Sequence, residues 1–427
     1  METTDWKRPF FLVWTGQAFS LLGSSLVQFA LIWWLTQLTG SAAILATATL
    51  VAILPSIFLG PFAGALVDRW SRRWVMIISD ACVALATLVL VFLFWLKVIQ
   101  PWHVFVILFI RSLTGVFQGP AMLASTSLMV PEEHLSRITG LNQALRGLMG
   151  IAAPPLGALL LQLLPMFGVL SVDIVTALIA IVPLFFVPIP QPGSGKAVTV
   201  TPRTILQDVQ SGLKYVASWP GLLGIILLAM VLNFLFAPTG SFIPLLVTEH
   251  FKGTAWHLSG LESVMGVGII IGGLGLGAWG GFKKRILTSL VGIIGMCFGI
   301  ILTSAATADK FWIALVAMGI VGLMSPIANG PLTAIIQARV APEMQGRVIT
   351  VLDSGATAMM PISLALAAPI AEFFGVRTWF IVSGSLCALI AAAAFFIKPI
   401  MRVEENGSGV SEGVAGVSVT GSITHQS

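Results

Sequence analysis

Long apolar segments are the feature that most constrains the fold of this 427-residue chain. A helix rises ~1.5 Å per residue, so about 20 residues are enough to cross a hydrocarbon core of ~30 Å. In lipid, a helix satisfies its own backbone hydrogen bonds within one segment. We therefore predict an all-α membrane protein with twelve transmembrane helices. The predicted spans are 9–37, 42–66, 74–96, 103–128, 141–164, 168–190, 221–247, 258–281, 286–307, 311–336, 349–374 and 377–399.

The composition agrees with this class and argues against others. Hydrophobic residues make up 57% of the chain and charged residues 9%, with a mean hydropathy of +0.99. Soluble domains carry about 25% charged residues. The net charge of +5 needs no nucleic-acid partner, because membrane proteins collect Lys and Arg in cytoplasmic loops and no basic run is interleaved with aromatic residues. The lipid bilayer is the expected surrounding.

The distribution of basic residues predicts the orientation of the helices. With the N-terminus inside, 17 of the 22 Lys and Arg residues fall in cytoplasmic segments, four fall outside, and Arg111 lies within the membrane. The excess of positive charge marks the cytoplasmic side. We therefore expect a multi-pass protein with both termini in the cytoplasm.

The sequence also repeats. The string at 130–137 aligns with that at 340–347 at an offset of 210, with Glu133 over Glu343 and Arg137 over Arg347. Such a parallel repeat predicts two pseudo-symmetric six-helix halves, 1–190 and 221–400. The polar linker, 191–220, has the apolar spacing of an amphipathic helix lying on the membrane surface. The Gly- and Ser-rich tail, 401–427, is expected to be disordered.

The loop between the second and third segments carries a specific motif, which we name the signature loop (residues 64–73). Its glycine permits close helix approach, its aspartate can cap a neighbouring helix N-terminus, and its arginines hold the loop at the cytoplasmic face. The residues concerned are Gly64, Asp68, Arg69, Arg72 and Arg73. Their order resembles the loop signature of the major facilitator superfamily.

Shorter strings make the resemblance closer. The chain is similar to the macrolide-efflux branch of bacterial drug exporters at 14–20, 108–112, 130–135, 261–263 and 345–348. The resemblance implies a monomeric transporter in the bacterial inner membrane that exports a bulky amphiphilic compound by proton antiport through alternating access. Export of an endogenous metabolite such as a siderophore stays open as an alternative. A third hypothesis, a membrane receptor or enzyme without transport, has little support because the sequence carries no catalytic constellation.

No cofactor is expected. The G-x-G-x-x-G match at 275–280 lies inside an apolar segment and follows no strand, so helix packing explains it better than dinucleotide binding. No metal-ligand spacing and no nucleophile–base pattern is present in the sequence. The partners that remain are a small-molecule substrate and protons.

Ionisable residues inside the membrane are the candidates for proton coupling, because burying a charge there is costly. Arg111 lies roughly 12 Å from the outer end of its segment and Asp173 roughly 7–8 Å from the same face. We expect Arg111 to pair with Asp173 or with an acidic or polar group reached across the cavity. Glu262 lies near the outer mouth, and Asp80 enters from the cytoplasmic side. Asp353, in the first turn of its segment, is expected to complement a helix dipole.

Uncharged polar residues on the first helices of each half are candidates for the wall of a substrate cavity, which Arg111 is also expected to line. Interhelical hydrogen bonding explains them equally well. These residues are Gln17, Gln28, Asn233 and Asn329. For the signature loop, we expect Asp68 to dock at the cytoplasmic N-terminus of the eleventh segment and so to stabilise the outward-open state.

Overall fold

The computed structural model describes residues 6–189 and 202–405, and within these ranges it contains helices and no strand. Twelve of the helices are long and apolar enough to cross a membrane. The first six form one half of the molecule. They are α1 (Lys7–Thr39), α2 (Ala42–Arg69), α3 (Arg72–Trp95), α4 (Pro101–Met129), α5 (Glu132–Leu163) and α6 (Met166–Phe186).

The second half repeats this arrangement. Its first helix is extended by a π-helical turn, Leu246–His250, and a short 3-10 turn, Ala308–Lys310, precedes the fourth. The six helices are α8 (Pro220–Leu245), α9 (Ala255–Trp279), α10 (Arg285–Ala305), α11 (Phe311–Arg339), α12 (Pro342–Phe374) and α13 (Val376–Ala394). The prediction of twelve membrane helices is confirmed.

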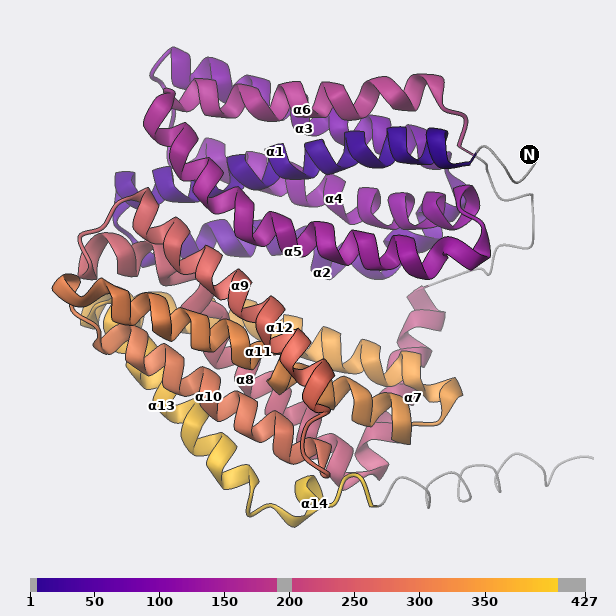
Figure 1. The fold of residues 1–427 in the computed structure, drawn as a ribbon, viewed down its shortest axis with the longest axis vertical. Helices are drawn as coiled ribbons and strands as arrows, with labels where there is room; N and C mark the ends of the chain where they lie inside the picture. Colours follow the sequence, from indigo (N-terminus) through magenta and orange to yellow (C-terminus); the bar gives the residue numbers. More distant parts are fainter. Residues whose placement is uncertain (1–5, 190–201, 406–427) are drawn as a thin grey trace, which may run out of the picture.

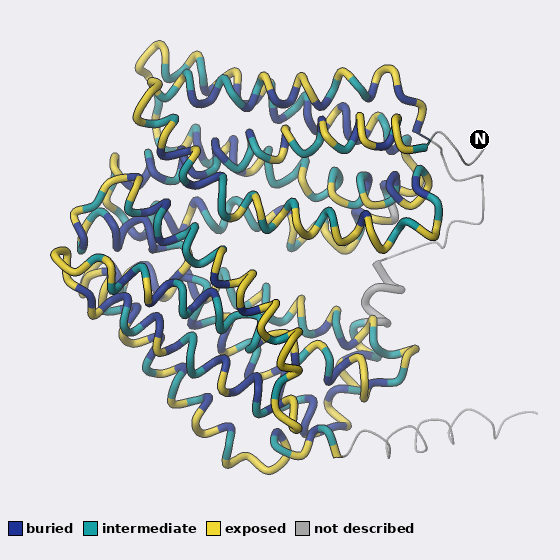
Figure 2. Tube along the Cα trace, viewed as in Figure 1, coloured by how far each residue is buried: buried dark blue, intermediate teal, exposed yellow. Residues whose placement is uncertain are grey.

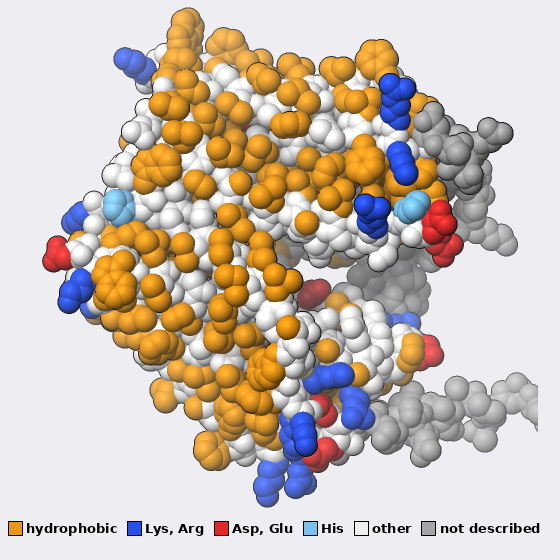
Figure 3. All heavy atoms as spheres, in the orientation of Figure 1, with side chains coloured by type: hydrophobic (Ala, Val, Ile, Leu, Met, Phe, Trp, Pro, Cys, Tyr) orange, Lys and Arg blue, Asp and Glu red, His pale blue; other side chains and the backbone are white. Residues whose placement is uncertain are grey.

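The two halves lie side by side, touch at one end and diverge at the other (Figure 1). We call the end where they touch the closed face; there α1 ends and α2 begins. The opposite end, where α1 begins and α2 ends, is the open face. Hydrophobic side chains cover the flanks of both halves, while charged side chains gather toward the two ends (Figure 3). This distribution fits a protein whose flanks are solvated by lipid.

The buried core follows the same division. One hydrophobic cluster joins the halves at the closed face, where the first turns of α2 meet the last turns of α12. Each of the other clusters contains residues of one half only. In Figure 2, buried segments of the two halves lie next to each other toward the closed face. The α2–α12 part of the shared cluster comprises Ala42, Leu45, Ala46, Leu364, Ala367, Ala368 and Ala371. Small residues predominate in this contact, which lets the two helices approach closely.

The repeat found in the sequence is visible in side-chain contacts. Arg72, the first residue of α3, donates a 2.9 Å hydrogen bond to the carbonyl of Ala124 on α4. Arg285, the first residue of α10, donates a 3.0 Å bond to the carbonyl of Ala334 on α11. The two acceptors are separated by the same offset, 210, that relates the two Glu-x-x-x-Arg strings. In each half, an arginine therefore ties two helices together at the open face.

The segment joining the halves contains α7 (Pro202–Ser218), as the amphipathic pattern predicted. At Gly212 this helix approaches α12 so closely that a Cβ would lie 3.0 Å from the carbonyl oxygen of Arg347. It therefore lies against the second half. Its position on the membrane surface stays a prediction, and residues 191–201 lie outside the described residues.

The predicted start of the tail is wrong by a few residues. The chain continues past 401 through the short helix α14 (Lys398–Met401) to Glu405, and Val403 is fully buried. Glu404 accepts a hydrogen bond from the Ile286 backbone, and Glu405 pairs with Lys284 at 3.1 Å. These acidic contacts fix the segment to the start of α10. The rest of the predicted tail, 406–427, lies outside the described residues.

Two helices begin well before their predicted spans. Helix α5 begins at Glu132 rather than 141, and α12 at Pro342 rather than 349. Their first turns are polar, so hydropathy detects only the later part, while acidic residues near the N-terminus favour the helix. As a result, Asp353 lies about three turns into α12 and not in its first turn, which contradicts the helix-dipole role expected for it.

The signature loop is also more helical than predicted. Residues up to Arg69 belong to α2, and only Trp70 and Ser71 separate this helix from α3. A Cβ added at Gly64 would meet nothing within 4 Å. The close helix approach expected at this glycine is therefore absent from this conformation, because the two halves are apart at the open face.

Candidate functional site

Arg111 and Asp173 form a buried ion pair in the interior of the first half. Arg111 Nη1 lies 2.6 Å from Asp173 Oδ2, and the two side chains are 9% and 1% exposed. The arginine comes from α4 and the aspartate from α6. The pairing expected from their similar depth is thus present, and each charge is compensated by the other rather than by water.

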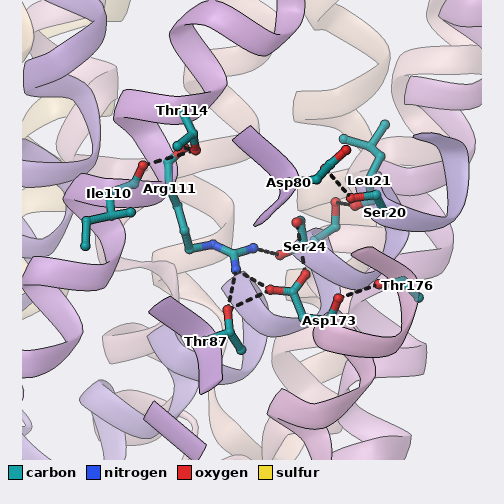
Figure 4. Close-up of polar contacts among 11 residues, drawn as sticks. Ser20, Leu21, Ser24, Asp80, Thr87, Ile110, Arg111, Thr114, Asp173 and Thr176 are labelled. Atoms are coloured by element: carbon teal, nitrogen blue, oxygen red, sulfur yellow. Dashed lines mark hydrogen bonds and ion pairs between the residues drawn. The ribbon is translucent and has the colours of Figure 1, made fainter. Parts of the chain in front are cut away.

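Hydrogen bonds from two further helices complete this pair (Figure 4). Ser24 of α1 donates its hydroxyl to Asp173 Oδ1 at 3.1 Å, and its carbonyl accepts from Arg111 Nη2 at 2.9 Å. Thr87 of α3 donates to Asp173 Oδ2 at 2.9 Å. A buried ion pair needs such additional bonds to offset the cost of leaving water. Four helices of the first half are therefore linked at one point.

A glycine on α1 makes this arrangement possible. A Cβ at Gly23 would overlap Thr176 Oγ1 and would lie 3.3 Å from the Asp173 Cα atom, both on α6. The absence of a side chain at this position lets α1 approach α6 closely enough for Ser24 to reach the aspartate.

We expect Gly23→Ala to lower the free energy of unfolding by ~1–3 kcal/mol, because the added methyl group pushes α1 away from α6. Thermal unfolding of the purified protein in detergent measures the change. The matched control is Gly60→Ala in α2, where a Cβ meets nothing within 4 Å. That change should be neutral or stabilising by up to ~1 kcal/mol. Equal effects of the two substitutions would contradict the packing role of Gly23.

Asp80 lies in a second polar cluster, closer to the open face. This residue is 2% exposed, and its carboxylate accepts hydrogen bonds from Gln17 Nε2 at 2.8 Å, Ser20 Oγ at 2.9 Å and Gln118 Nε2 at 2.8 Å. Gln118 also donates to Gln17 Oε1 at 2.9 Å. Among the described residues, no cation pairs with Asp80. This carboxyl group is therefore held by neutral amide and hydroxyl donors alone.

A cavity of about 1140 Å³ lies between the two halves. Its wall combines apolar side chains with several polar residues of both clusters, and its volume exceeds the usual range of drug-sized pockets, ~300–1,000 Å³. The wall includes Gln17, Ser20, Ser24, Gln28, Arg111 and Gln118 from the first half and Ile243, Leu258, Glu262, Met265 and Ile269 from the second. A bulky compound with both apolar and polar parts fits such a wall.

Glu262 is the acidic residue in this wall. It lies on α9, about two turns after the helix begins at Ala255. Among the described residues, it makes no hydrogen bond or ion pair. Arg111 is already paired with Asp173, so this arginine does not compensate the charge of Glu262. The Glu262 carboxyl group is therefore available to bind a proton or a ligand in the cavity.

The structure does not bring two of the expected wall residues to the cavity. Asn233 and Asn329 are not among its lining residues; both are exposed. Each amide donates to a backbone carbonyl of its own helix, that of Ala229 at 3.0 Å and that of Ser325 at 2.9 Å. Asp353 is likewise absent from the wall, whereas Gln17, Gln28 and Arg111 are present as predicted.

The signature loop makes contacts within its own half. Asp68 is 61% exposed and pairs with Arg72 at 3.2 Å, one turn further along the chain. Arg73 donates to the Phe185 carbonyl at 2.6 Å, and Arg69 is exposed. The docking of Asp68 on α12 concerns the opposite conformation, and it stays a prediction.

Sequence reasoning missed Ser20, Ser24, Thr87 and Gln118. The signal for them is a polar stripe at helical spacing, since residues three, four or seven apart share one helix face. On α1 these are Gln17, Ser20, Ser24 and Gln28; on α3, Asp80 and Thr87; on α4, Arg111, Thr114 and Gln118. Following each stripe from its charged or amide residue identifies the hydrogen-bond donors to the Asp80 and Asp173 carboxylates.

Two halves of six helices around a shared cavity, with ionisable groups inside the membrane, define a secondary transporter. The sequence of residues 13–358 matches the Major Facilitator Superfamily. The chain belongs to this family. It is a multi-pass membrane transporter and not an enzyme.

Relatives with functional names resemble most of the chain. Macrolide efflux protein A of Streptococcus pyogenes is 35% identical over 400 residues, covering 94% of this chain and 98% of the relative. The multidrug efflux pump Tap of Mycolicibacterium fortuitum is 26% identical over 413 residues, with the same two coverages. The predicted resemblance to the macrolide-efflux branch is confirmed.

A solved structure shares the fold. It is a bacterial homologue of the human lysosomal transporter Spinster in an inward-facing, unoccupied conformation. The TM-score is 0.70 at 12% identity, and the match covers 95% of this chain and 98% of that one. At this identity, the likeness establishes the fold alone.

Proposed function

We propose that this protein exports a bulky amphiphilic compound of the macrolide type from the bacterial cytoplasm by proton antiport. The cavity carries the proposal: it lies between the halves, combines apolar and polar walls, and holds an acidic group without a described partner. The relatives named for macrolide and multidrug efflux support the substrate class. Arg111, Asp173, Glu262 and Asp80 are the proposed coupling residues.

The orientation is part of the proposal. Most Lys and Arg residues lie at the end of the molecule that we call the open face, and excess positive charge marks the cytoplasmic side. The closed face would then point outward, and the conformation described here would be the inward-open one. A substrate from the cytoplasm or the inner leaflet would enter between the halves.

Transport measurements test this function. A drug-sensitive bacterial host expressing the protein should become resistant to macrolides, and vesicles containing it should accumulate or release macrolide according to an imposed pH gradient. Resistance without any dependence of transport on the pH gradient would support the proposed substrate class and contradict proton antiport. Transport of a siderophore-like metabolite and not of macrolides would favour the alternative substrate class.

Asp68→Asn should strongly reduce efflux without lowering the amount of protein in the membrane. We expect this because Asp68 would stabilise the outward-open state by docking on the N-terminus of α12, where a carboxylate contributes up to ~2 kcal/mol when partly buried. Vesicle efflux and quantitative immunoblotting of membranes measure the two quantities. Full efflux by the variant would reject the docking role.

A further inference from the structure

A polar contact joins the two halves at the closed face. Glu372, in the last turn of α12, accepts a hydrogen bond from the Ser41 hydroxyl at 2.6 Å and another from the Ala43 backbone N–H at 3.2 Å. Ser41 is the N-cap residue of α2, and it also accepts from the Ile44 backbone at 3.3 Å. The N–H groups of a first helical turn have no partner within their own helix. Glu372, from the other half, supplies a partner for one of these groups, the N–H of Ala43.

A second contact occupies the equivalent place between α5 and α9. Trp256, in the first turn of α9, donates its indole N–H to Gln162 Oε1 near the end of α5 at 2.9 Å. Gln162 and Glu372 are 210 positions apart, the offset of the internal repeat. Ala43 and Trp256 are both second residues of their helices. The internal repeat thus places an acceptor at the end of one helix against the start of another on both sides of the cavity.

The two contacts differ in charge. Glu372 brings a carboxylate to a helix N-terminus, where the macrodipole favours negative charge, whereas Gln162 is neutral. Hydrogen bonds that involve an ionised acceptor are roughly twice as strong as neutral ones. The Glu372 contact is therefore the stronger of the two, although both break when the halves separate at this face.

We propose that Glu372 is a positioning residue for alternating access: it holds the closed face shut by capping α2 across the two halves. This rests on the proposed transport cycle, in which the closed face must open. Asp68 lies at the opposite end of the same helix pair, and its predicted partner is the N-terminus of α12. The two carboxylates then favour opposite conformations, and each helix of the pair is capped by the other.

The populations of the two conformations test this role directly. Spin labels at Val98→Cys, in an exposed loop of the first half, and at Asp309→Cys, in the exposed 3-10 turn of the second, lie at the closed face. Pulsed electron paramagnetic resonance measures the distance between them in purified protein without substrate or gradient. Cys82→Ser removes the cysteine that is not buried, while Cys297 and Cys387 are buried and stay unlabelled. Glu372→Ala should raise the ratio of separated to closed conformers on the order of fivefold to tenfold.

Graded variants distinguish this role from a general structural one. Glu372→Gln keeps an acceptor oxygen and should shift the ratio less than Glu372→Ala, as should Gln162→Ala. Asp68→Asn should shift the ratio the other way, and the double variant with Glu372→Ala should return toward the original value. Glu249→Gln is the matched control: this acid is exposed at the same face, and among the described residues its carboxyl group makes no hydrogen bond or ion pair with the first half.

An unchanged distance distribution in Glu372→Ala, or an equal shift in Glu249→Gln, would overturn the proposal. A loss of thermal stability without a change in the ratio would also overturn it. The distance measurement requires neither drug nor gradient. If Glu372→Ala shifts the ratio of separated to closed conformers but the protein exports no macrolide, the role of Glu372 is supported and the proposed substrate is rejected.

Discussion

Arg111→Ala is expected to destabilise the protein by about 3–5 kcal/mol and to abolish proton-coupled efflux. The substitution leaves the Asp173 carboxylate, which is 1% exposed, with only the hydroxyl groups of Ser24 and Thr87 as donors. Removing one partner of a buried ion pair carries a cost of this size because the other charge stays buried and uncompensated. Thermal unfolding of the purified protein measures the stability, and vesicle efflux measures the transport.

The double variant Arg111→Ala with Asp173→Asn separates the two effects. It removes both charges, so much of the lost stability should return while coupled efflux stays absent. If Arg111→Ala alone is as stable as the original protein, the Arg111–Asp173 pair does not stabilise the first half. Normal efflux by the double variant would show that the pair is structural and that coupling takes place elsewhere.

Glu262→Gln should reduce efflux driven by a pH gradient to background while leaving protein stability unchanged. Glutamine has the same shape but cannot bind and release a proton, and Glu262 has no described partner whose loss would destabilise the fold. Downhill exchange of substrate across the membrane should persist, because that process moves no net proton. Vesicle efflux with and without the gradient separates the two activities.

Glu249→Gln is again the matched control, since this acid lies outside the cavity wall. It should retain gradient-driven efflux. Retention of that efflux by Glu262→Gln would remove Glu262 from the coupling mechanism. Asp80 would then be the next candidate, because its carboxyl group is also held without a described cation.

The sequence predicted the membrane helices well because length and hydropathy alone decide whether a segment can span a bilayer. It predicted the Arg111–Asp173 pair for a similar reason, since depth along two helices can be counted in residues. The first turns of α5 and α12 escaped detection because their polar residues lie outside the apolar part of each helix. Asp353 was misplaced as a consequence.

Residue type gave less information about which way a side chain faces. Asn233 and Asn329 have the polarity expected of a cavity wall, but their amides bond to carbonyls of their own helices. Gln118 and Thr87 were missed because each is unremarkable alone and becomes informative only with Arg111 or Asp80 two turns away. The cross-half contact of Glu372 depends on the conformation, which hydropathy does not encode.

The tie between Arg72 and Ala124, with its repeat between Arg285 and Ala334, has a mechanical consequence. Each joins two helices of one half at the open face and none of the other half, so each half can tilt there as a unit. The contacts between the halves described above join α2 with α12 and α5 with α9, and both lie toward the closed face. Together these features allow each half to rotate as a rigid body about an axis near the closed face. A small rotation about this axis produces a wide displacement at the open face.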